Sequence, residues 1–476
     1  LSGICAAYYL QTRCPGKRYA ILESRDAIGG TWDLFRYPGV RSDSDMFTLG
    51  YSFRPWRDPR AIAGGPAILA YLRETAAVYG IDRRIRFGHR VHRAAWSSAE
   101  ARWTVEAERA PGEVVRLTCS FLLMCGGYYD YARGYTPEWP GVARFAGRLV
   151  HPQEWPADLD YAGKRVVIVG SGATAVTLAP ALARRAAHVT ILQRSPTYVV
   201  SRPSHDAAAD RLRRRLPRRL AAGLVRWRSV LLGLYYYRLM RRKPAEARDT
   251  LLRAVRAQLG PDYDVATHFT PRYNPWDQRL CLAPDGDFFA AIRAGAVSVV
   301  TDRIDTFTET GIRLRSGADL AADIVVTATG LVMRWLGGVR VAVDGAPVDP
   351  ARALTYKGAM LSDVPNLAAI FGYTNASWTL KAELIARYVC RLLNYMDRRG
   401  YTTCTPRRTD PALVAEPLLD FTSGYVQRAL PALPRQGSRR PWRLYQNYLL
   451  DTLTLRLGRV NDGTLAFARH GRRGAA

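Results

Sequence analysis

Two parts of this chain alternate between short apolar runs and amphipathic stretches. Near the start, residues 2–11 have the small and apolar spacing of a helix, and residues 19–23 (YAILE) form an apolar run that predicts a strand. Further along, residues 164–170 and 189–194 predict two strands, and residues 173–185 predict the helix between them. The pattern indicates an α/β chain with two strand–helix–strand units. In the first unit the sequence contains only the helix and the strand that follows it.

Other apolar segments extend this outline. Residues 120–127 (SFLLMCGG) and residues 322–330 (ADIVVTATG) each predict a strand that closes on small residues. Residues 297–314 predict a short meander, and residues 383–399 predict an amphipathic helix. The length of 476 residues exceeds the size at which a single core stops growing, so we expect two or more domains.

The second unit carries a nucleotide-binding turn. Gly170, Gly172 and Ala175 (GSGATA) stand between the predicted strand and helix, in the G-x-G-x-x-A spacing that lets backbone amides approach a pyrophosphate. The second strand of the unit ends at Arg194 without an acidic residue. Because arginine attracts a 2′-phosphate and a carboxylate would repel it, the predicted nucleotide is NADPH rather than NADH.

The first unit carries only the end of such a turn. Leu1, Ser2 and Gly3 match the x-x-G that closes the fingerprint, and Glu23 follows at the spacing of the acid that binds ribose hydroxyls. The first strand and two phosphate-turn glycines would lie before residue 1, and the chain begins with Leu rather than Met. We therefore expect a fragment in which the first strand of this domain is missing and which binds its nucleotide poorly or not at all.

Cysteine usage and hydropathy limit the cellular setting. The seven cysteines are scattered and include no C-x-x-C pair, which favours a reduced, cytoplasmic setting and argues against a flavin disulfide reductase. The sequence has no run of about 18 uncharged apolar residues, so no membrane-spanning helix is predicted. We predict no bound metal.

The net charge of +28 is partly concentrated in one segment. Residues 201–250 contain 14 basic and four acidic residues, and they predict a broken helix with Arg on one side and Leu, Trp and Tyr on the other. A solvated helical face and contact with an anionic membrane surface both agree with this pattern. No nucleic-acid motif accompanies the charge, so we do not expect nucleic acid as a partner.

Two further motifs accompany the glycine turns. One lies just ahead of the second unit and matches F-x-G-x-x-x-H-x-x-x-W-P through Phe145, Gly147, His151, Trp155 and Pro156. The other matches G-x-W-x-x-x-x-Y-P-G-x-x-x-D through Gly30, Trp32, Tyr37, Pro38, Gly39 and Asp43. With these motifs, nearly the whole chain resembles the class B flavin monooxygenases of the Baeyer-Villiger type.

The resemblance implies an α/β fold with two Rossmann-like dinucleotide-binding domains and a helical insertion. The FAD-binding domain would comprise residues 1–135 and 325–476, and the NADPH-binding domain would comprise residues 136–195 and 291–324. The basic segment, residues 196–290, would be the insertion. The two strands that close on small residues would carry the chain between the domains.

The resemblance also implies the reaction. Enzymes of this family insert one oxygen atom of O2 into ketones to give esters or lactones, and the likeness extends this to sulfur compounds such as thioamides, through a C4a-peroxyflavin. Arg279, in the segment NPWDQRLCL, matches the arginine that the family places over the flavin, and Asp43 would orient it. A fixed guanidinium would stabilise the negative oxygen that develops.

Cofactor contacts carry over residue by residue. For FAD they are Ser2, Gly3, Glu23, Thr31, Trp32, Asp33, Leu34, Asp43 and Val91. For NADPH they are Arg41, Ser42, Asp43, Gly170, Ser171, Gly172, Ala173, Thr174, Ala175, Val176, Arg194 and Ser195. We interpret His151 as a hinge residue between the domains rather than an acid or a base.

Two alternatives stay open from the sequence. An N-hydroxylating or S-oxygenating flavin monooxygenase shares both nucleotide-binding units, although such enzymes typically diverge at the His and Trp of the F-x-G-x-x-x-H-x-x-x-W-P motif. A truncated, non-catalytic homologue would bind a nucleotide or a membrane surface without turnover. The sequence predicts neither the natural substrate nor an oligomeric state.

Overall fold

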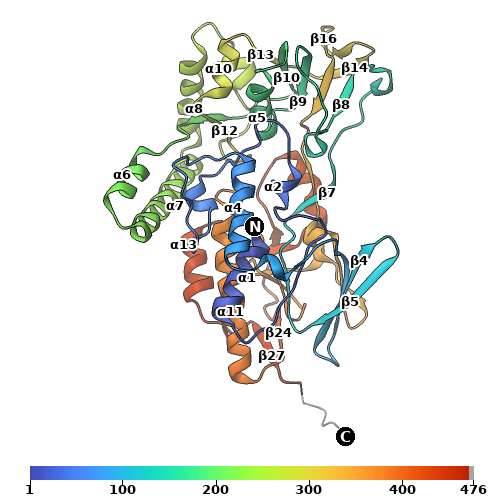
Figure 1. Cartoon of the computed structure of the whole chain (residues 1–476), viewed down its shortest axis with the longest axis vertical. Coiled ribbons are helices and arrows are strands. Elements are labelled where there is room, and N and C mark those ends of the chain that lie inside the picture. The colour runs from blue at the N-terminus through green and yellow to red at the C-terminus, as the bar shows by residue number, and fades with distance from the viewer. Residues whose placement is uncertain (471–476) are drawn as a thin grey trace.

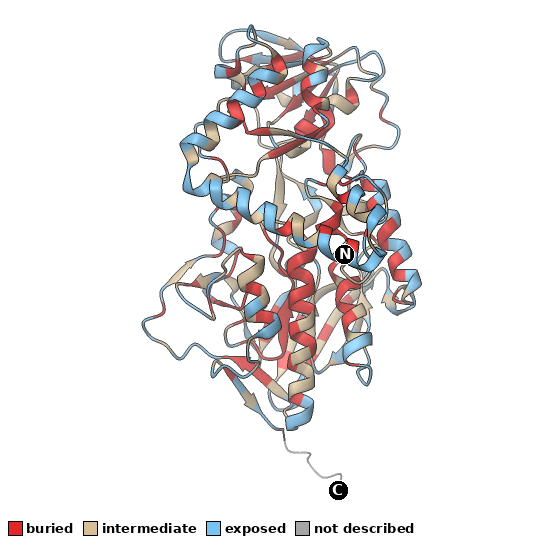
Figure 2. Ribbon diagram, turned by 90° about the vertical axis from the view of Figure 1, so that its left-hand side faces the viewer, coloured by how far each residue is buried: buried red, intermediate tan, exposed pale blue. Residues whose placement is uncertain are grey.

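The computed structural model describes residues 1–470 and has an upper and a lower lobe (Figure 1). The upper lobe contains a parallel sheet, and the lower lobe contains the N-terminal helix, a long C-terminal helix and several smaller sheets. Figure 2 shows buried strands in the upper lobe and a largely buried long helix in the lower lobe. Each lobe therefore has a core of its own.

Five parallel strands in the order β13-β10-β9-β17-β8 form the upper sheet. Their bounds are β8 (Arg148–Val150), β9 (Arg165–Val169), β10 (His188–Gln193), β13 (Val297–Thr301) and β17 (Ile324–Thr327). The helix α5 (Ala173–Leu182) connects β9 to β10, which confirms the predicted strand–helix–strand unit. Helices cover one face and a small antiparallel sheet covers the other, as the apolar strands of a parallel sheet require.

The predicted meander over residues 297–314 is only partly correct. Its first part, β13, pairs in parallel with β10, with Val297 beside Val189. The antiparallel meander consists of β14 (Ile304–Thr308), β15 (Gly311–Leu314) and β16 (Asp319–Ala321). Val297 and Val299 pack into the helix-covered face of the upper sheet. A short apolar run predicts a strand but does not reveal the partner of that strand.

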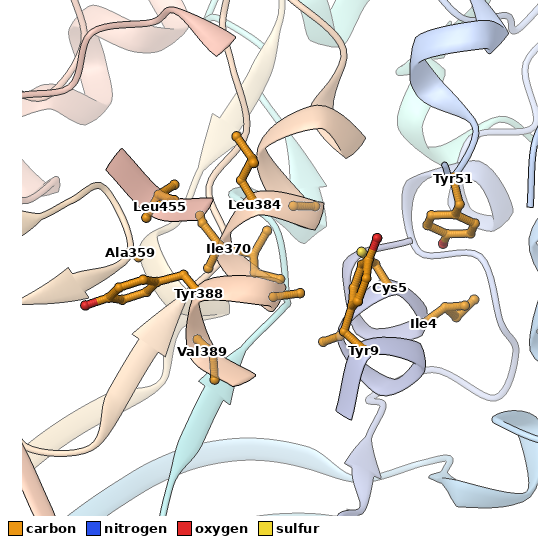
Figure 3. Packing of buried hydrophobic residues seen from close by; sticks show 14 of the residues in the cluster. Ile4, Cys5, Tyr9, Tyr51, Ala359, Ile370, Leu384, Tyr388, Val389 and Leu455 are labelled. Carbon is orange, nitrogen blue, oxygen red and sulfur yellow. The ribbon is translucent and has the colours of Figure 1, made fainter. Parts of the chain in front are cut away.

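Two helices organise the lower lobe. The helix α1 (Ser2–Arg13) packs against α11 (Trp378–Arg399), and Figure 3 shows side chains of both in the shared core. The Arg387 guanidinium donates a hydrogen bond to Tyr9 Oη at 2.8 Å. The helix α11 begins at Trp378, ahead of the predicted start at Glu383, because buried residues continue the helix in that direction.

Two small sheets flank the start of α1. One pairs β1 (Ile21–Leu22) with β2 (Ile85–Arg86) in parallel, and the other has the order β21-β22-β23-β6. The strands of the second sheet are β6 (Leu122–Met124), β21 (Thr355–Tyr356), β22 (Met360–Leu361) and β23 (Leu367–Ala369). A Cβ atom at Gly3 would lie 3.8 Å from Ile21 Cγ2 and 3.9 Å from Cys125 Cβ. The helix therefore begins between these two sheets.

A third sheet of the lower lobe has the order β20-β19-β3-β4-β5. Its strands are β3 (Arg90–Ser97), β4 (Arg102–Ala110), β5 (Glu113–Cys119), β19 (Arg340–Val343) and β20 (Ala346–Pro347). Trp96 and Trp103 face each other across β3 and β4, with ring centroids 5.6 Å apart, and both are buried. This pair anchors a separate apolar cluster beside the two helices.

Two strands connect the lobes side by side. β7 (Tyr129–Gly134) and β18 (Leu331–Met333) pair antiparallel, with Leu331 opposite Gly134. They follow β6 and β17, the two predicted strands that close on small residues. Because β17 belongs to the upper sheet, the return crossing follows Thr327, whereas the expected boundary was residue 325.

The basic segment is largely helical but also contains strands. Its helices are α6 (Ala207–Arg215), α7 (Arg218–Arg242), α8 (Pro244–Leu259) and α9 (Val265–Phe269). At its edges, β11 (Val199–Arg202) pairs in parallel with β12 (Cys281–Pro284). Residues of α8 and of α10 (Asp287–Arg293) belong to the core of the upper lobe. The segment is thus partly integral to that lobe.

The helix α7 does not separate Arg from apolar side chains as the sequence pattern predicted. Arg226 turns inward, where its guanidinium donates to the Gly50 carbonyl oxygen at 2.7 Å, while Leu231 is 50% exposed. Figure 2 faces this side of the molecule, where the helices of the basic segment are mostly pale blue and tan. Among residues 1–470, no helix is both long and apolar enough to cross a membrane.

Candidate active site

One large cavity is lined by both lobes. Its volume is about 2010 Å³, which exceeds the roughly 300–1,000 Å³ of a single small-molecule pocket and fits two dinucleotides. Seventeen of the predicted site residues are in its wall. They are Ser2, Gly3, Glu23, Thr31, Trp32, Arg41, Ser42, Asp43, Val91, Gly170, Ser171, Gly172, Ala173, Thr174, Arg194, Ser195 and Arg279.

The part of the cavity in the lower lobe is suited to a phosphate group at the start of α1. Ser2 and Gly3 line the wall there, and backbone amides at a helix N-terminus attract negative charge. Ser2 Oγ accepts a hydrogen bond from Trp378 Nε1 at 2.8 Å, which joins this point to α11. Glu23 follows β1 and lines the same cavity, and one of its carboxylate oxygens accepts from the Arg25 backbone N–H at 3.0 Å. The other carboxylate oxygen leaves an acceptor for a ribose hydroxyl.

Four predicted contact residues lie outside the cavity wall, namely Asp33, Leu34, Ala175 and Val176. Asp33 is 2% exposed and pairs with Arg25 at 2.5 Å and with Arg73 at 3.0 Å. Its carboxylate thereby joins α2 (Thr31–Leu34) to α4 (Gly65–Val78). The two residues of α5 are buried in the core of the upper lobe. The resemblance implied that these residues contact a cofactor, but the side chains of Asp33, Ala175 and Val176 are buried in the protein, and Leu34 is half-buried outside the cavity wall.

The glycine turn lies at the carboxyl end of β9. Gly170 has a φ angle of +138°, and a Cβ atom there would lie 2.3 Å from the Ala328 carbonyl oxygen, so the position requires glycine. A Cβ atom at Gly172 would meet no atom within 4 Å, because this position opens onto the cavity. The start of α5 therefore directs backbone amides toward the cavity, an arrangement suited to a pyrophosphate.

Arg194 has two further arginines beside it. The backbone N–H of Asp302 donates to the Gln193 carbonyl oxygen at 3.0 Å, which places the end of β13 next to the end of β10. Arg303 and Arg315 line the cavity from there, and the Arg315 backbone N–H donates to the Arg303 carbonyl oxygen at 2.9 Å. Neither arginine was among the site residues predicted from the sequence. Recognition of β13 as the parallel neighbour of β10 would have found Arg303.

Arg279 lies in the cavity wall between the two nucleotide-binding parts. It precedes β12, in which the Cys281 thiol is 3.9 Å from the carbonyl oxygen of Ser171 in the glycine turn. Toward the lower lobe it interacts electrostatically with Asp43, which belongs to the second sequence motif. The structure thus brings together two residues that are far apart in the sequence, as the resemblance implied.

Three tyrosines interact electrostatically with Arg279, and none of them was among the site residues predicted from the sequence. They are Tyr128, Tyr129 and Tyr425. Burial would lower the pKa of Arg279, but the interactions with these tyrosines and with Asp43 outweigh burial and raise the pKa above its usual value. Because arginine stays protonated in proteins, the guanidinium is a permanent cation in the cavity wall. The position of Tyr128 and Tyr129 directly after a predicted strand was the available sequence signal.

Asp43 and Arg41 connect this site to both lobes. Burial raises the pKa of the Asp43 carboxyl group, and Arg279 and Arg41 oppose this effect. Arg41 donates to Asp287 at 2.5 Å and to the Leu282 carbonyl oxygen at 3.3 Å. Arg41 lines the cavity, but its guanidinium already joins the motif loop to α10 of the upper lobe.

The residues of the F-x-G-x-x-x-H-x-x-x-W-P motif lie outside the wall of the large cavity. His151 stands beside the paired strands that connect the lobes. Its Nδ1 accepts from the Gln153 backbone N–H at 3.1 Å, so Nε2 carries the proton and donates to the Gly330 carbonyl oxygen at 3.2 Å. A Cβ atom at Gly134 would lie 1.9 Å from the imidazole ring, so only glycine leaves room for the ring at this position. Burial lowers the pKa of His151, in agreement with a neutral ring.

The other motif residues pack around the upper sheet. Phe145 contacts Phe307 of the meander, with ring centroids 5.8 Å apart. Gly147 approaches the Asp323 backbone so closely that a Cβ atom would lie 2.5 Å from its carbonyl oxygen. Trp155 packs against the helix-covered core of the same lobe. The motif marks the junction of the lobes rather than the cavity itself.

Comparisons with known proteins agree with this geometry. Residues 1–59 match the family described as NAD(P)-binding Rossmann-like domain, and residues 62–222 match the family described as Flavin-binding monooxygenase-like. These matches point to the class of flavin-binding monooxygenases.

Two full-length relatives are identical to the chain at about half of the aligned positions. The FAD-containing monooxygenase EthA of Mycobacterium tuberculosis is 55% identical over 470 residues, which are 98% of this chain and 96% of the relative. The putative FAD-containing monooxygenase MymA of the same species is 50% identical over 474 residues, with 98% and 96% covered. The chain belongs to this family of FAD-containing monooxygenases. The predicted enzyme class, an NADPH-dependent flavin monooxygenase, and its cofactors FAD and NADPH are confirmed.

A solved structure described as oxidized steroid monooxygenase bound to NADP has the same fold. It superposes with a TM-score of 0.75 over 98% of both chains at 23% sequence identity. This likeness confirms the predicted α/β fold with Rossmann-like nucleotide-binding domains.

Proposed function

We propose that this monooxygenase inserts one oxygen atom of O2 into ketones, giving esters or lactones, and oxygenates sulfur compounds such as thioamides. The observation that carries the proposal is the position of Arg279, a permanent cation in the cavity wall between the two nucleotide-binding parts. A fixed positive charge stabilises an oxygen atom that becomes negative during the reaction. The F-x-G-x-x-x-H-x-x-x-W-P motif supports the ketone reaction over plain N- or S-oxygenation.

The residues of the chain supply binding, orientation and charge. FAD, when bound, supplies the electron transfer from NADPH and the activation of O2. Ser2, Gly3 and Glu23 hold the FAD, while the glycine turn and Arg194 hold the NADPH. Arg279 stabilises negative charge on oxygen, and the carboxylate of Asp43 keeps the guanidinium oriented.

The aromatic wall near Arg279 is suited to an apolar substrate with one polar group. The Tyr128 ring lies 5.2 Å from Trp378 and 5.2 Å from Phe371, and both Tyr128 and Trp378 line the cavity. Pockets of this kind bind mainly through apolar surface and orient the ligand through a few polar groups. The carbonyl group of a ketone or the sulfur of a thioamide would therefore point toward Arg279.

We also propose His151 as the hinge between the FAD-binding and NADPH-binding domains. Its hydrogen bond to the Gly330 carbonyl oxygen and its close packing on Gly134 support this role, because these two residues lie on the two chain crossings. We propose the same two nucleotide-binding domains, with α8 and α10 assigned to the NADPH-binding domain and the return to the FAD-binding domain placed after Thr327.

Turnover with defined substrates tests the proposed reaction. Purified protein loaded with FAD should consume NADPH faster when a ketone or a thioamide is added, and the oxygenated product should appear. The variant Arg279→Ala should lose at least about a hundredfold of product formation, as expected when a charge-stabilising donor is removed, while the flavin is still reduced by NADPH. NADPH oxidation that yields only hydrogen peroxide in the unmodified protein would contradict the proposal.

We further propose that α7 contacts an anionic membrane surface. A stripe of its side chains faces solvent, namely Leu220, Leu224, Trp227, Leu231 and Tyr235. The segment that contains it, residues 201–250, carries ten more basic than acidic residues (14 minus 4). Apolar side chains combined with basic charge favour the interface of anionic lipids over neutral ones.

Vesicle binding tests the membrane contact. The protein should sediment with vesicles of phosphatidylglycerol and phosphatidylcholine but not with phosphatidylcholine alone, and salt should weaken the binding. The double variant Leu224→Gln, Leu231→Gln should bind several-fold less. Val114→Ser, which alters a 50% exposed residue on β5, is the matched control. Equal binding of all three proteins would refute this contact.

A further inference from the structure

The loop that carries Arg279 is attached to α7. We call residues 274–280 the Arg279 loop. Arg241, near the end of α7, donates to Asp277 Oδ1 at 2.6 Å. The other carboxylate oxygen of Asp277 accepts from the Asn274 backbone N–H at 3.0 Å. The Asp277 side chain therefore binds across to the helix and back to the start of its own loop.

The backbone of Asp277 binds a third element. Its carbonyl oxygen accepts two hydrogen bonds from Thr422, one from the backbone N–H at 2.9 Å and one from Oγ1 at 3.2 Å. Thr422 precedes α12 (Gly424–Ala429), which contributes Tyr425 to the surroundings of Arg279. One residue thus joins the Arg279 loop to α7 and to the C-terminal segment that completes the site.

The conformation of the Arg279 loop requires support from outside the loop. Trp276 has a φ angle of +72°, in the left-handed region that bulky residues rarely adopt. Its indole Nε1 is buried and has no hydrogen-bond partner within residues 1–470. The ring of Tyr237, on α7, packs edge-on against Trp276 with centroids 5.2 Å apart. Local preference therefore opposes this conformation, and tertiary contacts maintain it.

We infer that Asp277 is a positioning residue that, together with Arg241 and Thr422, fixes Arg279 in the cavity. The inference rests on the proposed function, because it concerns how Arg279 is held for that reaction. Asp277 itself does not line the cavity, so it acts through the loop rather than on a cofactor or a substrate. The Arg241–Asp277 pair is partly exposed, at 36% and 27%, so its loss should cost little global stability. Its main effect should fall on the geometry of the loop.

Two measurements on the FAD-loaded protein test the role of Asp277. The first is the fraction of consumed NADPH that ends as oxygenated product rather than hydrogen peroxide, with KM and kcat determined separately. The second is amide hydrogen exchange of residues 274–280 and 420–425. The variants are Asp277→Ala, Asp277→Asn and Arg241→Lys. The control is Asp319→Asn, which breaks the 2.9 Å pair between Arg313 and Asp319 on the meander, a pair of similar or greater exposure.

Asp277→Ala should lower product formation about tenfold or more, through kcat rather than the KM for NADPH, because a small displacement of a charge-stabilising group has a large effect on rate. Peroxide should increase, and exchange in both segments should accelerate. Asp277→Asn keeps an acceptor but loses the charge, so it should show a smaller change of the same kind. Product formation and amide exchange in Arg241→Lys should stay close to those of the unmodified protein. The control Asp319→Asn should give the same values as the unmodified protein.

The inference would be overturned if both Asp277 variants showed unchanged amide exchange and converted an unchanged fraction of the consumed NADPH into oxygenated product. Equal changes in Asp319→Asn would overturn it as well, because any surface ion pair would then suffice. If Asp277→Ala does not fold, the Asn variant decides by the same two measurements. If the unmodified protein forms no oxygenated product but exchange still accelerates in the variants, the proposed function fails while the attachment of the Arg279 loop through Asp277 stands.

Discussion

The two nucleotide-binding parts of the cavity are assembled in different ways. In the upper lobe, the glycine turn, the start of α5 and Arg194 come from one continuous stretch between β9 and the end of β10. In the lower lobe and around Arg279, the wall combines α1, the loop with Asp43, Tyr128 and Tyr425. Local sequence patterns specify the first kind of site, whereas the second kind depends on which distant segments the fold brings together.

The largest expected effect would break the locally built site. Gly170→Val should abolish detectable NADPH binding or weaken it at least about a hundredfold, because a side chain at this positive φ meets the Ala328 carbonyl oxygen. NADPH titration measures this, and flavin absorbance reports whether the lower lobe still holds FAD. Gly223→Ala, where an added Cβ meets no atom within 4 Å, is the control. Unchanged NADPH affinity would show that the turn is not the site.

A second change acts on the lower lobe alone. Asp33→Ala should reduce the free energy of unfolding by about 2 kcal/mol, because it leaves arginines of two elements without their buried carboxylate, although those arginines are partly exposed. Urea unfolding measures the loss. Asp58→Ala, which removes an exposed carboxylate near Arg60, should change stability by a few tenths of a kcal/mol at most. If NADPH affinity also fell in Asp33→Ala, the two nucleotide-binding parts would not be independent.

The third prediction concerns the selectivity of the upper lobe for NADPH over NADH. Arg194→Gln should weaken NADPH binding about tenfold and leave NADH binding nearly unchanged, because only NADPH carries the 2′-phosphate. The loss stays moderate because Arg303 and Arg315 remain beside the site. The ratio of KM values for the two nucleotides measures the effect. An equal change for both nucleotides would contradict the assignment of Arg194.

The smallest effect concerns the junction between the two regions. The pKa of His151 is lowered by burial from its ordinary value of 6.5, so the folded protein favours the neutral ring. The unfolded chain then binds more protons as the pH falls below about 6.5, and the contribution of His151 to stability decreases, by no more than about 1 kcal/mol. His151→Gln should show a weaker loss of melting temperature between about pH 7 and about pH 5.5. If His151→Gln and the unmodified protein showed the same pH dependence of the melting temperature, protonation of His151 would not contribute to stability.

Part of the fold and of the site followed from the sequence for identifiable reasons. The strand, glycine turn and helix around Gly170 are contiguous, so their periodicity and spacing predicted β9, α5 and β10. The same periodicity could not place β13, because a short apolar strand does not specify its neighbour. Arg303 was missed for that reason. The predicted separation of Arg from apolar side chains on α7 was wrong because Arg226 donates hydrogen bonds to distant backbone and so faces inward.

The sequence by itself determined the family, the two cofactors and the glycine turn, because these depend on residue types at fixed, short spacings. Only the tertiary structure decided which side chains lie around Arg279, since Asp43, Tyr128 and Tyr425 come from separate parts of the chain. It also decided that the buried carboxylate of Asp33 pairs with Arg25 and Arg73 and that the motif with His151 lies at the junction of the lobes. Spacing along a chain fixes local backbone geometry, but the direction of a side chain and its distant partners depend on how the lobes fold together.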